Sequence, residues 1–206
     1  MEAAHIRIAT PGDAPALPPV DRSAGELFRS LPELAWLADG EGMPVARHRE
    51  LIERGVVWVA VDHDDRPVAF LEAEVFGDEL HVWEVSVHRD WQLRGLGRAL
   101  MTAAAEHAMR TGLAALTLTT FRDVPWNGPF YTRLGFAPIA APDLSERLRQ
   151  VLGHEVAAGL PAGRRCAMRQ TLVAQLSTHA NAAIAGSTLA DRSARQTRPL
   201  ARTVLE

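Results

Sequence analysis

The segment from Glu84 to Leu100 constrains the fold of this 206-residue chain more than any other. It begins as the end of a β-strand, apolar and β-branched at Val85 and Val87, and it ends by opening a helix. A short loop with Gly95 and Gly97 lies between them. The first backbone N–H groups of a helix lack intrahelical partners, and the helix dipole favours negative charge there. Because glycine has no Cβ, a phosphate can approach this backbone closely. The segment therefore predicts an anion site.

The spacing of the loop excludes two common nucleotide motifs. Its core reads Gln92-x-x-Gly95-x-Gly97, which differs from GxxxxGK[ST], and all 22 basic residues of the chain are arginine. It also differs from GxGxxG, because Leu100 stands where the third glycine would fall. We therefore do not expect a P-loop or a Rossmann site.

The loop resembles the pyrophosphate-binding motif of the GNAT superfamily of acetyl-coenzyme A-dependent N-acetyltransferases. The segment Asn127–Phe136 resembles that superfamily's Phe-Tyr-x-x-x-Gly-Phe motif, and it follows in the right order. The motifs span residues 84–136, and looser similarity spans about 4–171. The run Thr119–Trp126, followed by Asn127, is similar to one bacterial GNAT subgroup, without implying a substrate.

Composition narrows the class of protein further. The net charge of −3 gives no reason to expect a nucleic-acid partner or an anionic membrane surface. No apolar run approaches the length of a membrane span, and the N-terminus lacks a signal-peptide pattern. Cys166 is the single cysteine, so a disulfide framework within the chain is excluded. We expect a cytoplasmic protein without a metal.

The predicted elements give an α/β fold with a mixed, mainly antiparallel central sheet flanked by helices, which is also the fold that the GNAT resemblance implies. Residues 1–172 are expected to form this domain, and 173–206, rich in Ala, Ser, Thr and Arg, a mobile tail. The expected strands are His5–Ala9, Val56–Val61, Val68–Val75, Leu80–Val87, Ala114–Thr120, Phe136–Ile139 and Arg165–Leu172. The expected helices are Val20–Arg29, Pro44–Arg54, a helix from the glycine loop to Arg110, Asn127–Leu134 and Pro142–Ala158, with a loop over Leu31–Gly42.

The resemblance implies that acetyl-coenzyme A is the co-substrate and that its pantetheine arm pairs with the strand before the loop. In the family the sheet splays beside this strand. Asn127 is open to two interpretations, a cofactor contact or a helix cap. The predicted cofactor residues are Val85, Ser86, Val87, Gln92, Leu93, Arg94, Gly95, Leu96, Gly97, Arg98, Ala99 and Asn127.

Acyl transfer to an amine requires a base that removes a proton from the ammonium and a donor that protonates the thiolate. The resemblance implies that Tyr131 is the donor, and a phenol with a reference pKa of about 10 is protonated at neutral pH. Glu84 is the predicted base, with Glu72, Glu74 and His81 as competitors. A base is not required if the amine arrives neutral.

Strand alternation places Glu84 on one face with Val82 and Ser86, opposite Trp83 and Val85.

The acceptor pocket is expected between the segments Val20–Trp36 and Phe121–Trp126 and the strand that carries Trp83. The side chains of Phe28, Trp83 and Trp126 would line it, or else simply pack in the core. The carboxylates of Asp21, Glu26 and Asp123 could receive a cationic amine.

The sequence thus predicts direct transfer of an acetyl group to a primary amine in a ternary complex. The expected acceptor is a small molecule, the alternatives being a protein or peptide N-terminus and a non-catalytic acyl-coenzyme A sensor. The family also allows a homodimer.

Overall fold

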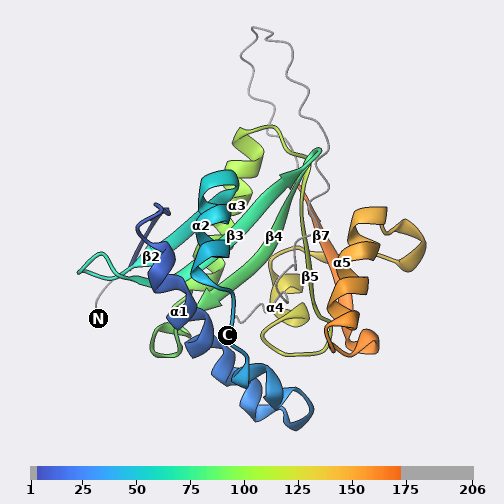
Figure 1. The fold of residues 1–206 in the computed structure, drawn as a ribbon. Coiled ribbons are helices and arrows are strands. Elements are labelled where there is room, and N and C mark those ends of the chain that lie inside the picture. The colour runs from blue at the N-terminus through green and yellow to red at the C-terminus, as the bar shows by residue number, and fades with distance from the viewer. Residues whose placement is uncertain (1–3, 173–206) are drawn as a thin grey trace, which may run out of the picture.

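The computed structural model describes residues 4–172, so the predicted tail over 173–206 lies outside the described residues. One seven-stranded sheet runs through the fold in the order β1-β2-β3-β4-β5-β7-β6 (Figure 1). Neighbouring strands are antiparallel except β4 and β5, which are parallel. The strands are β1 (His5–Ile8), β2 (Val56–Val61), β3 (Pro67–Phe76), β4 (Glu79–Val87), β5 (Ala115–Phe121), β6 (Ala137–Pro138) and β7 (Arg165–Thr171). The predicted mixed, mainly antiparallel sheet is confirmed.

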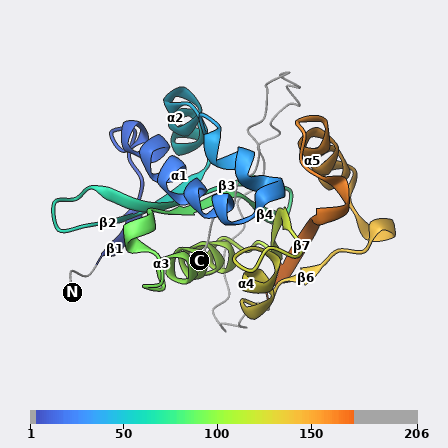
Figure 2. The ribbon, with the colours of Figure 1, turned by 90° about the horizontal axis from the view of Figure 1, so that it is seen from below.

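Helices cover both faces of the sheet, as Figure 2 shows from below. α1, α2 and α5 lie on one face, and α3 and α4 lie on the other. The α-helices are α1 (Leu17–Gly25), α2 (Val45–Arg54), α3 (Leu96–Arg110), α4 (Gly128–Arg133) and α5 (Glu146–Ala157). Short 3₁₀ helices occupy Ala14–Ala16, Glu26–Ser30, Pro32–Asp39, Arg89–Trp91, Ala141–Asp143 and Ala162–Arg164. Within residues 4–172 no helix is long and apolar enough to cross a membrane.

The first and last predicted helices differ most from the structure. The first ends at Gly25 rather than at Arg29, and the 3₁₀ helix Glu26–Ser30 follows it. The first helix begins three residues earlier than predicted, at Leu17, because prolines fit the first turn of a helix, where no N–H donor is needed. The predicted loop Leu31–Gly42 contains the 3₁₀ helix Pro32–Asp39. The last helix begins only after Ser145, whose hydroxyl accepts a hydrogen bond from the backbone N–H of Leu148 at 3.3 Å.

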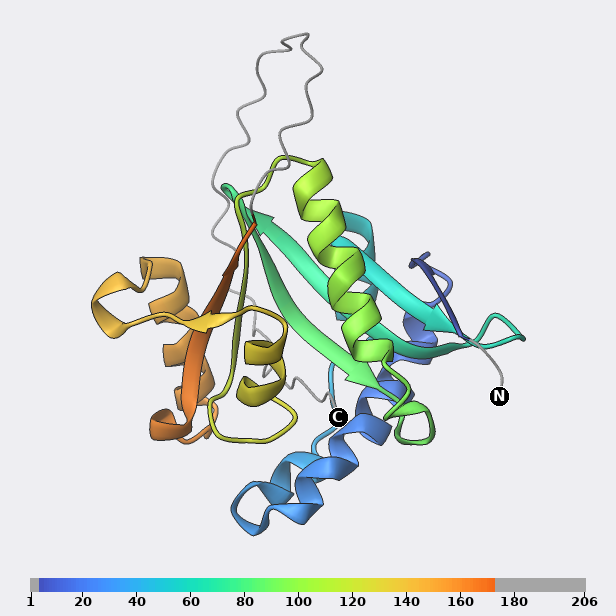
Figure 3. The same ribbon diagram turned by 180° about the vertical axis from the view of Figure 1, so that it is seen from behind.

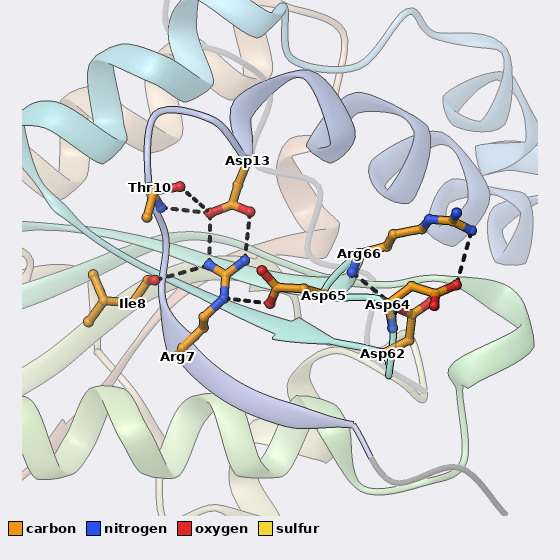
Figure 4. A network of polar contacts seen from close by, with 8 residues as sticks. All are labelled: Arg7, Ile8, Thr10, Asp13, Asp62, Asp64, Asp65 and Arg66. Carbon is orange, nitrogen blue, oxygen red and sulfur yellow. Dashed lines mark hydrogen bonds and ion pairs between the residues drawn. The ribbon is translucent and has the colours of Figure 1, made fainter.

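A polar network fixes the start of the chain against the β2–β3 turn (Figure 4). The Arg7 guanidinium donates to both carboxylate oxygens of Asp13, at 2.8 and 2.9 Å, and to Asp65 at 3.0 Å. The backbone N–H of Thr10 donates to Asp13 at 2.7 Å. The hydrogen bonds from Arg7 and Thr10 lower the pKa of Asp13 below its ordinary value, and those from Arg7 have the largest effect. The network anchors the edge strand β1, far from the glycine loop in sequence.

Candidate active site

β4 contains a β-bulge in its middle. Glu84 lies opposite Glu72 on β3, but the next residue of β3, Ala73, lies opposite Val82, so Trp83 is an extra residue in β4. The bulge reverses the alternation of side chains, and Val82 and Val85 both pack in the core beneath α3. Trp83 packs in the core beneath α1 and α2 instead. The prediction that Glu84 shares a face with Val82, opposite Trp83, is therefore wrong.

Beyond this bulge β4 separates from β5. The two strands pair only from Glu79–Ala115 to Val82–Leu118, although β4 continues to Val87. Figure 3 shows the strands diverging toward the end of β4, with α4 beside β5 on the α3 face of the sheet. The bulge bends β4 and ends its pairing with β5 at the same point. The backbone edge of β4 after Val82 can therefore pair with an extended ligand instead of a strand.

The glycine loop joins the end of β4 to the N-terminus of α3. Leu93 and Gly95 both have left-handed backbone, with φ of 60° and 77°. For leucine this conformation costs about 1–3 kcal/mol, a strain that is typical of ligand-binding loops. A Cβ placed on Gly95 would meet no atom within 4 Å, so the space in front of this backbone is open. The loop thus has the accessible backbone that a phosphate needs.

Two polar side chains hold this loop in place. Gln92 donates from Nε2 to the Val87 carbonyl oxygen at 3.1 Å, which ties the loop to the end of β4. Arg94 donates to the Asp90 carbonyl oxygen at 2.8 Å, and its guanidinium lies 4.7 Å from the centre of the Trp91 ring. These contacts give both side chains a role in loop geometry that the sequence did not predict.

Tyr131 lies on α4 and is fully buried on the α3 face of the sheet. Its ring packs edge-on against Phe130 and Phe136, with centroids 5.4 and 5.5 Å away. The first residue of α4 is Gly128, where a Cβ would lie 2.5 Å from the Arg122 carbonyl oxygen, so only glycine lets the helix approach the preceding loop this closely.

Asn127 is buried at the N-cap position of α4, but its side chain makes no capping hydrogen bond. The side-chain capping role that the sequence left open is therefore wrong, and the cofactor contact stays a prediction.

On the opposite face of the sheet, Glu84 belongs to a buried polar cluster. It comprises Asp21 from α1, His48 from α2, Glu72 from β3 and Glu84 from β4, each at most 2% exposed. His48 Nδ1 lies 2.7 Å from Glu72 Oε1, and the Ser86 hydroxyl donates to Glu84 at 2.9 Å. Four segments distant in sequence thus place three carboxyl groups and one imidazole beside the bulge.

The surroundings of Glu84 raise its pKa well above the ordinary value. Burial is the largest cause, followed by the negative charges of Asp21 and Glu72, whereas the Ser86 hydroxyl acts in the opposite direction. Burial also raises the pKa of Glu72, and His48 offsets part of that effect. A carboxyl group with a raised pKa is a stronger base once it is ionised, which suits proton removal from an amine.

The competing bases have other partners. Glu74 accepts a hydrogen bond from Trp83 Nε1 at 3.1 Å, and His81 Nδ1 lies 3.0 Å from the Thr117 hydroxyl. The third competitor, Glu72, stands in the cluster itself and faces Glu84 across the β3–β4 pair.

The aromatic residues predicted for the acceptor pocket are mostly packed together. Phe28 is fully buried, with its ring 5.7 Å from Phe121 and 5.9 Å from Trp126, measured between centroids. Phe28 is therefore a core residue. Trp126 is half-buried at the edge of this cluster, and Trp83 reaches the core beneath α1. The packing role that the sequence left open thus holds for Phe28.

The three acidic candidates for binding an amine differ in their surroundings. Glu26 accepts a hydrogen bond from Arg29 at 2.8 Å, and Asp123 accepts one from Arg164 at 2.8 Å. Asp21 lies beside Glu84 instead. The sequence did not indicate His48 as a site residue, although its place beside Leu51 on the apolar side of α2 was a signal, because a buried imidazole needs a partner.

Comparison with known proteins agrees with this arrangement. Residues 25–136 match the model of the acetyltransferase (GNAT) family. The chain belongs to the GNAT family. Membership of this family supports the predicted class of enzyme, an acetyltransferase.

Solved GNAT structures share the fold. The PaiA N-acetyltransferase from Thermoplasma acidophilum, crystallised with coenzyme A, aligns with a TM-score of 0.60 and 15% identity over 82% of this chain and 99% of its own. The ribosomal-protein-S18-alanine N-acetyltransferase from Escherichia coli aligns with a TM-score of 0.56 and 17% identity, covering 92% of this chain and 100% of its own.

A curated relative is much longer than this chain. The amino-acid acetyltransferase of Pasteurella multocida (strain Pm70) is 29% identical over 153 residues, which cover 73% of this chain. The chain spans only 31% of that relative's length. Coenzyme A, the carrier part of the predicted co-substrate, is the ligand in the PaiA structure. Among the described residues no group of three or more His, Cys, Asp or Glu side chains is arranged to hold a metal ion.

Proposed function

We propose that this GNAT chain transfers an acetyl group from acetyl-coenzyme A directly to a small primary amine in a ternary complex. One observation carries the proposal. Glu84 is a buried carboxyl group on the part of β4 that no longer pairs with β5, and Tyr131 is a buried phenol on α4, which lies beside β5 on the α3 face of the sheet (Figures 2 and 3). A base on one side and a proton donor on the other match the two proton transfers of the reaction.

The described residues suggest how the co-substrate is held. The open backbone at Gly95 and the first N–H groups of α3 suit the pyrophosphate, and the edge of β4 over Val85–Val87 suits the pantetheine arm. Arg98 in the first turn of α3 adds positive charge near the phosphates. Acetyl-coenzyme A supplies a thioester carbonyl carbon that a neutral amine attacks.

The protein's part in the chemistry is then proton transfer. In the proposal, the Glu84 carboxylate takes a proton from the acceptor ammonium, which restores the nitrogen lone pair. The Tyr131 hydroxyl donates a proton to the departing thiolate. Both groups are buried, and exclusion of water strengthens their electrostatic effect on the reacting atoms.

The charge of the acceptor follows from the cluster around Glu84. Asp21, Glu72 and Glu84 bring three carboxyl groups to one buried place, and only one of them, Glu72, contacts the imidazole of His48. This surplus of negative charge favours an acceptor that arrives as an ammonium ion. A protein N-terminal amine satisfies the same condition and remains the second candidate, since the Escherichia coli S18-alanine enzyme shares the fold. The bacterial subgroup suggested by Thr119–Trp126 and the homodimer remain predictions.

A thiol-release assay tests this function. The wild type is incubated with acetyl-coenzyme A and a panel of small amines, amino acids and peptides, beside Tyr131→Phe and Glu84→Gln. We expect turnover on one class of amine, and a loss of about 10²-fold or more in kcat for each variant with unchanged affinity for acetyl-coenzyme A. Full activity of both variants would contradict the assigned roles. Binding without turnover in the wild type would instead favour an acyl-coenzyme A sensor.

A further inference from the structure

Glu72 on β3 has one carboxylate oxygen that receives no hydrogen bond from the described chain. The residue is fully buried, and its Oε1 lies 2.7 Å from His48 Nδ1. The other oxygen, Oε2, is also buried, and it has no hydrogen-bond partner among residues 4–172. Almost all buried polar atoms in native proteins have a partner, so a buried oxygen without one calls for an explanation. A ligand that donates to Glu72 Oε2 would provide it.

His48 determines which oxygen of Glu72 is available. Its imidazole lies on α2, is fully buried and packs edge-on against Phe70, with the ring centroids 5.4 Å apart. Because a carboxylate oxygen only accepts hydrogen bonds, Nδ1 carries the proton that joins the two side chains. This bond favours the ionised form of Glu72 and leaves Oε2 for another donor.

Glu72 also faces the proposed base. It lies directly opposite Glu84 in the antiparallel pair of β3 and β4, at the edge of the bulge. Residues opposite each other in such a pair stand on one face of the sheet, with Cβ atoms about 4.5–5.5 Å apart. Since a charge-assisted N–H···O bond is about 2.7–2.9 Å long, one nitrogen between two such side chains can donate to both. The spacing therefore suits an ammonium group that contacts Glu72 and Glu84 at once.

Asp21 on α1 is the third carboxyl group of the cluster and differs from Glu72 in how it is held. Its Oδ2 accepts a hydrogen bond from the backbone N–H of Met43 at 3.3 Å, and its Oδ1 has no partner among the described residues. The position of Glu72 opposite Glu84 is fixed by strand register, whereas Asp21 reaches the cluster from a helix above the sheet. Glu72 is thus the better placed of the two to share a ligand with Glu84.

We propose that Glu72 anchors the acceptor: its second carboxylate oxygen accepts a hydrogen bond from the acceptor ammonium, and His48 is a positioning residue that holds Glu72 for this contact. The inference rests on the proposed function, because it places the ammonium beside Glu84. Glu72 keeps its hydrogen bond to the nitrogen during the reaction. A different N–H bond of the ammonium breaks, its proton moves to the Glu84 carboxylate, and the nitrogen keeps the electron pair that attacks the thioester. The site thus selects an acceptor that is cationic when it binds.

Methylammonium chloride is the smallest probe of this contact, and its use requires no knowledge of the acceptor. The imidazole nitrogens of the isotope-labelled full chain are followed by NMR during a titration, and His48 is assigned by the loss of its signals in His48→Asn. We expect a saturable change in the His48 signals. Methanol, which is of similar size but uncharged, and sodium chloride at equal ionic strength should give none. An equal response to methanol, or no saturable response to methylammonium with or without coenzyme A, would refute the anchor.

Glu72→Gln keeps the shape of the side chain and removes its charge. Loss of a charge-assisted hydrogen bond should weaken methylammonium binding by about 10- to 100-fold. Glu74→Gln is the matched control, because Glu74 lies on the same strand but its carboxylate accepts a hydrogen bond from Trp83 Nε1 at 3.1 Å. This control should bind methylammonium like the wild type. Equal weakening in both variants, or a greater loss in Asp21→Asn, would contradict the assignment. The wild-type titrations decide the proposal even if a variant does not fold.

Kinetics separate this inference from the proposed function. With an alkylamine that the wild type acetylates, Glu72→Gln should raise KM for the amine by about 10- to 100-fold and change kcat less, whereas Glu84→Gln lowers kcat. His48→Asn should raise the same KM by a smaller factor, because it acts through Glu72. An unchanged KM in Glu72→Gln would refute the anchor and leave the proposed function standing. Methylammonium binding without turnover on any amine would refute the proposed function instead.

Discussion

The substitution Glu155→Leu tests how much a buried ion pair between α5 and β7 contributes to the stability of the fold. Arg165 on β7 and Glu155 on α5 are 3% and 4% exposed. Two hydrogen bonds join them, at 2.9 Å from Nε and 2.8 Å from Nη2, and the Thr119 hydroxyl on β5 donates to Glu155 at 2.5 Å. The guanidinium also lies 4.7 Å from the centre of the Phe121 ring.

Leucine at position 155 would leave the Arg165 guanidinium buried without a carboxylate. Removing one partner of such a pair costs about 3–5 kcal/mol, because the desolvated charge stays behind. For a chain of this size that loss lowers Tm by about 6–20 °C. Urea unfolding at pH 7, analysed for the free energy of unfolding, measures it.

The double variant Glu155→Leu with Arg165→Met is the control for this argument. Since both charges are removed, it should recover most of the loss. A cost below about 1 kcal/mol for Glu155→Leu would refute the reasoning. A double variant as unstable as the single one would show that packing, rather than the unpaired charge, causes the loss.

Three further predictions concern other parts of the fold. Asp13→Asn should cost about 1–3 kcal/mol at pH 7 in urea unfolding. The cost should shrink as pH falls through the lowered folded-state pKa of Asp13, because the charged pair with Arg7 is then lost in the wild type as well. The stability of Glu84→Gln relative to the wild type should rise as pH increases from about 4.3 toward the raised folded-state pKa of Glu84, because the unfolded wild type releases the Glu84 proton at lower pH than the folded one. Urea unfolding at several pH values checks this. Gly95→Ala should cost about 1–2 kcal/mol through its φ of 77° and weaken acetyl-coenzyme A binding, which calorimetry measures.

Local sequence signals were sufficient for much of the fold. The bounds of β2 agree with the prediction. Those of β4 differ by one residue at one end and those of β3 by one residue at each end, because β-branched runs between turn residues are a local feature. The glycine loop was predictable for the same reason, because the strand, the two glycines and the following helix are adjacent in the sequence. The starts of α1 and α5 differ from the predicted positions, because several residues can begin a helix there. Prolines occupy the first turn of α1, and Ser145 caps α5.

The polar cluster and the bulge depend on contacts that no single segment contains. The extra residue Trp83 is defined only by the register between β3 and β4, so alternation alone wrongly put Glu84 on the same face as Val82. The bond between His48 and Glu72 joins positions 24 residues apart. Asp21 meets Glu84 only because α1 crosses the sheet above the bulge. The sequence therefore predicted some of the residues in the site. Which of these residues contact one another could be seen only in the folded structure.

Thermal melting with and without acetyl-coenzyme A tests the central claim, that this chain binds this co-substrate, most directly. A ligand present at 100 times its Kd stabilises the folded state by about 2.7 kcal/mol, which raises Tm by about 5–11 °C for a chain of this size. We predict a shift of this size that Gly95→Ala reduces at the same concentration of ligand. The absence of a shift in the wild type at saturating acetyl-coenzyme A would contradict the account of the glycine loop and of the site built on it.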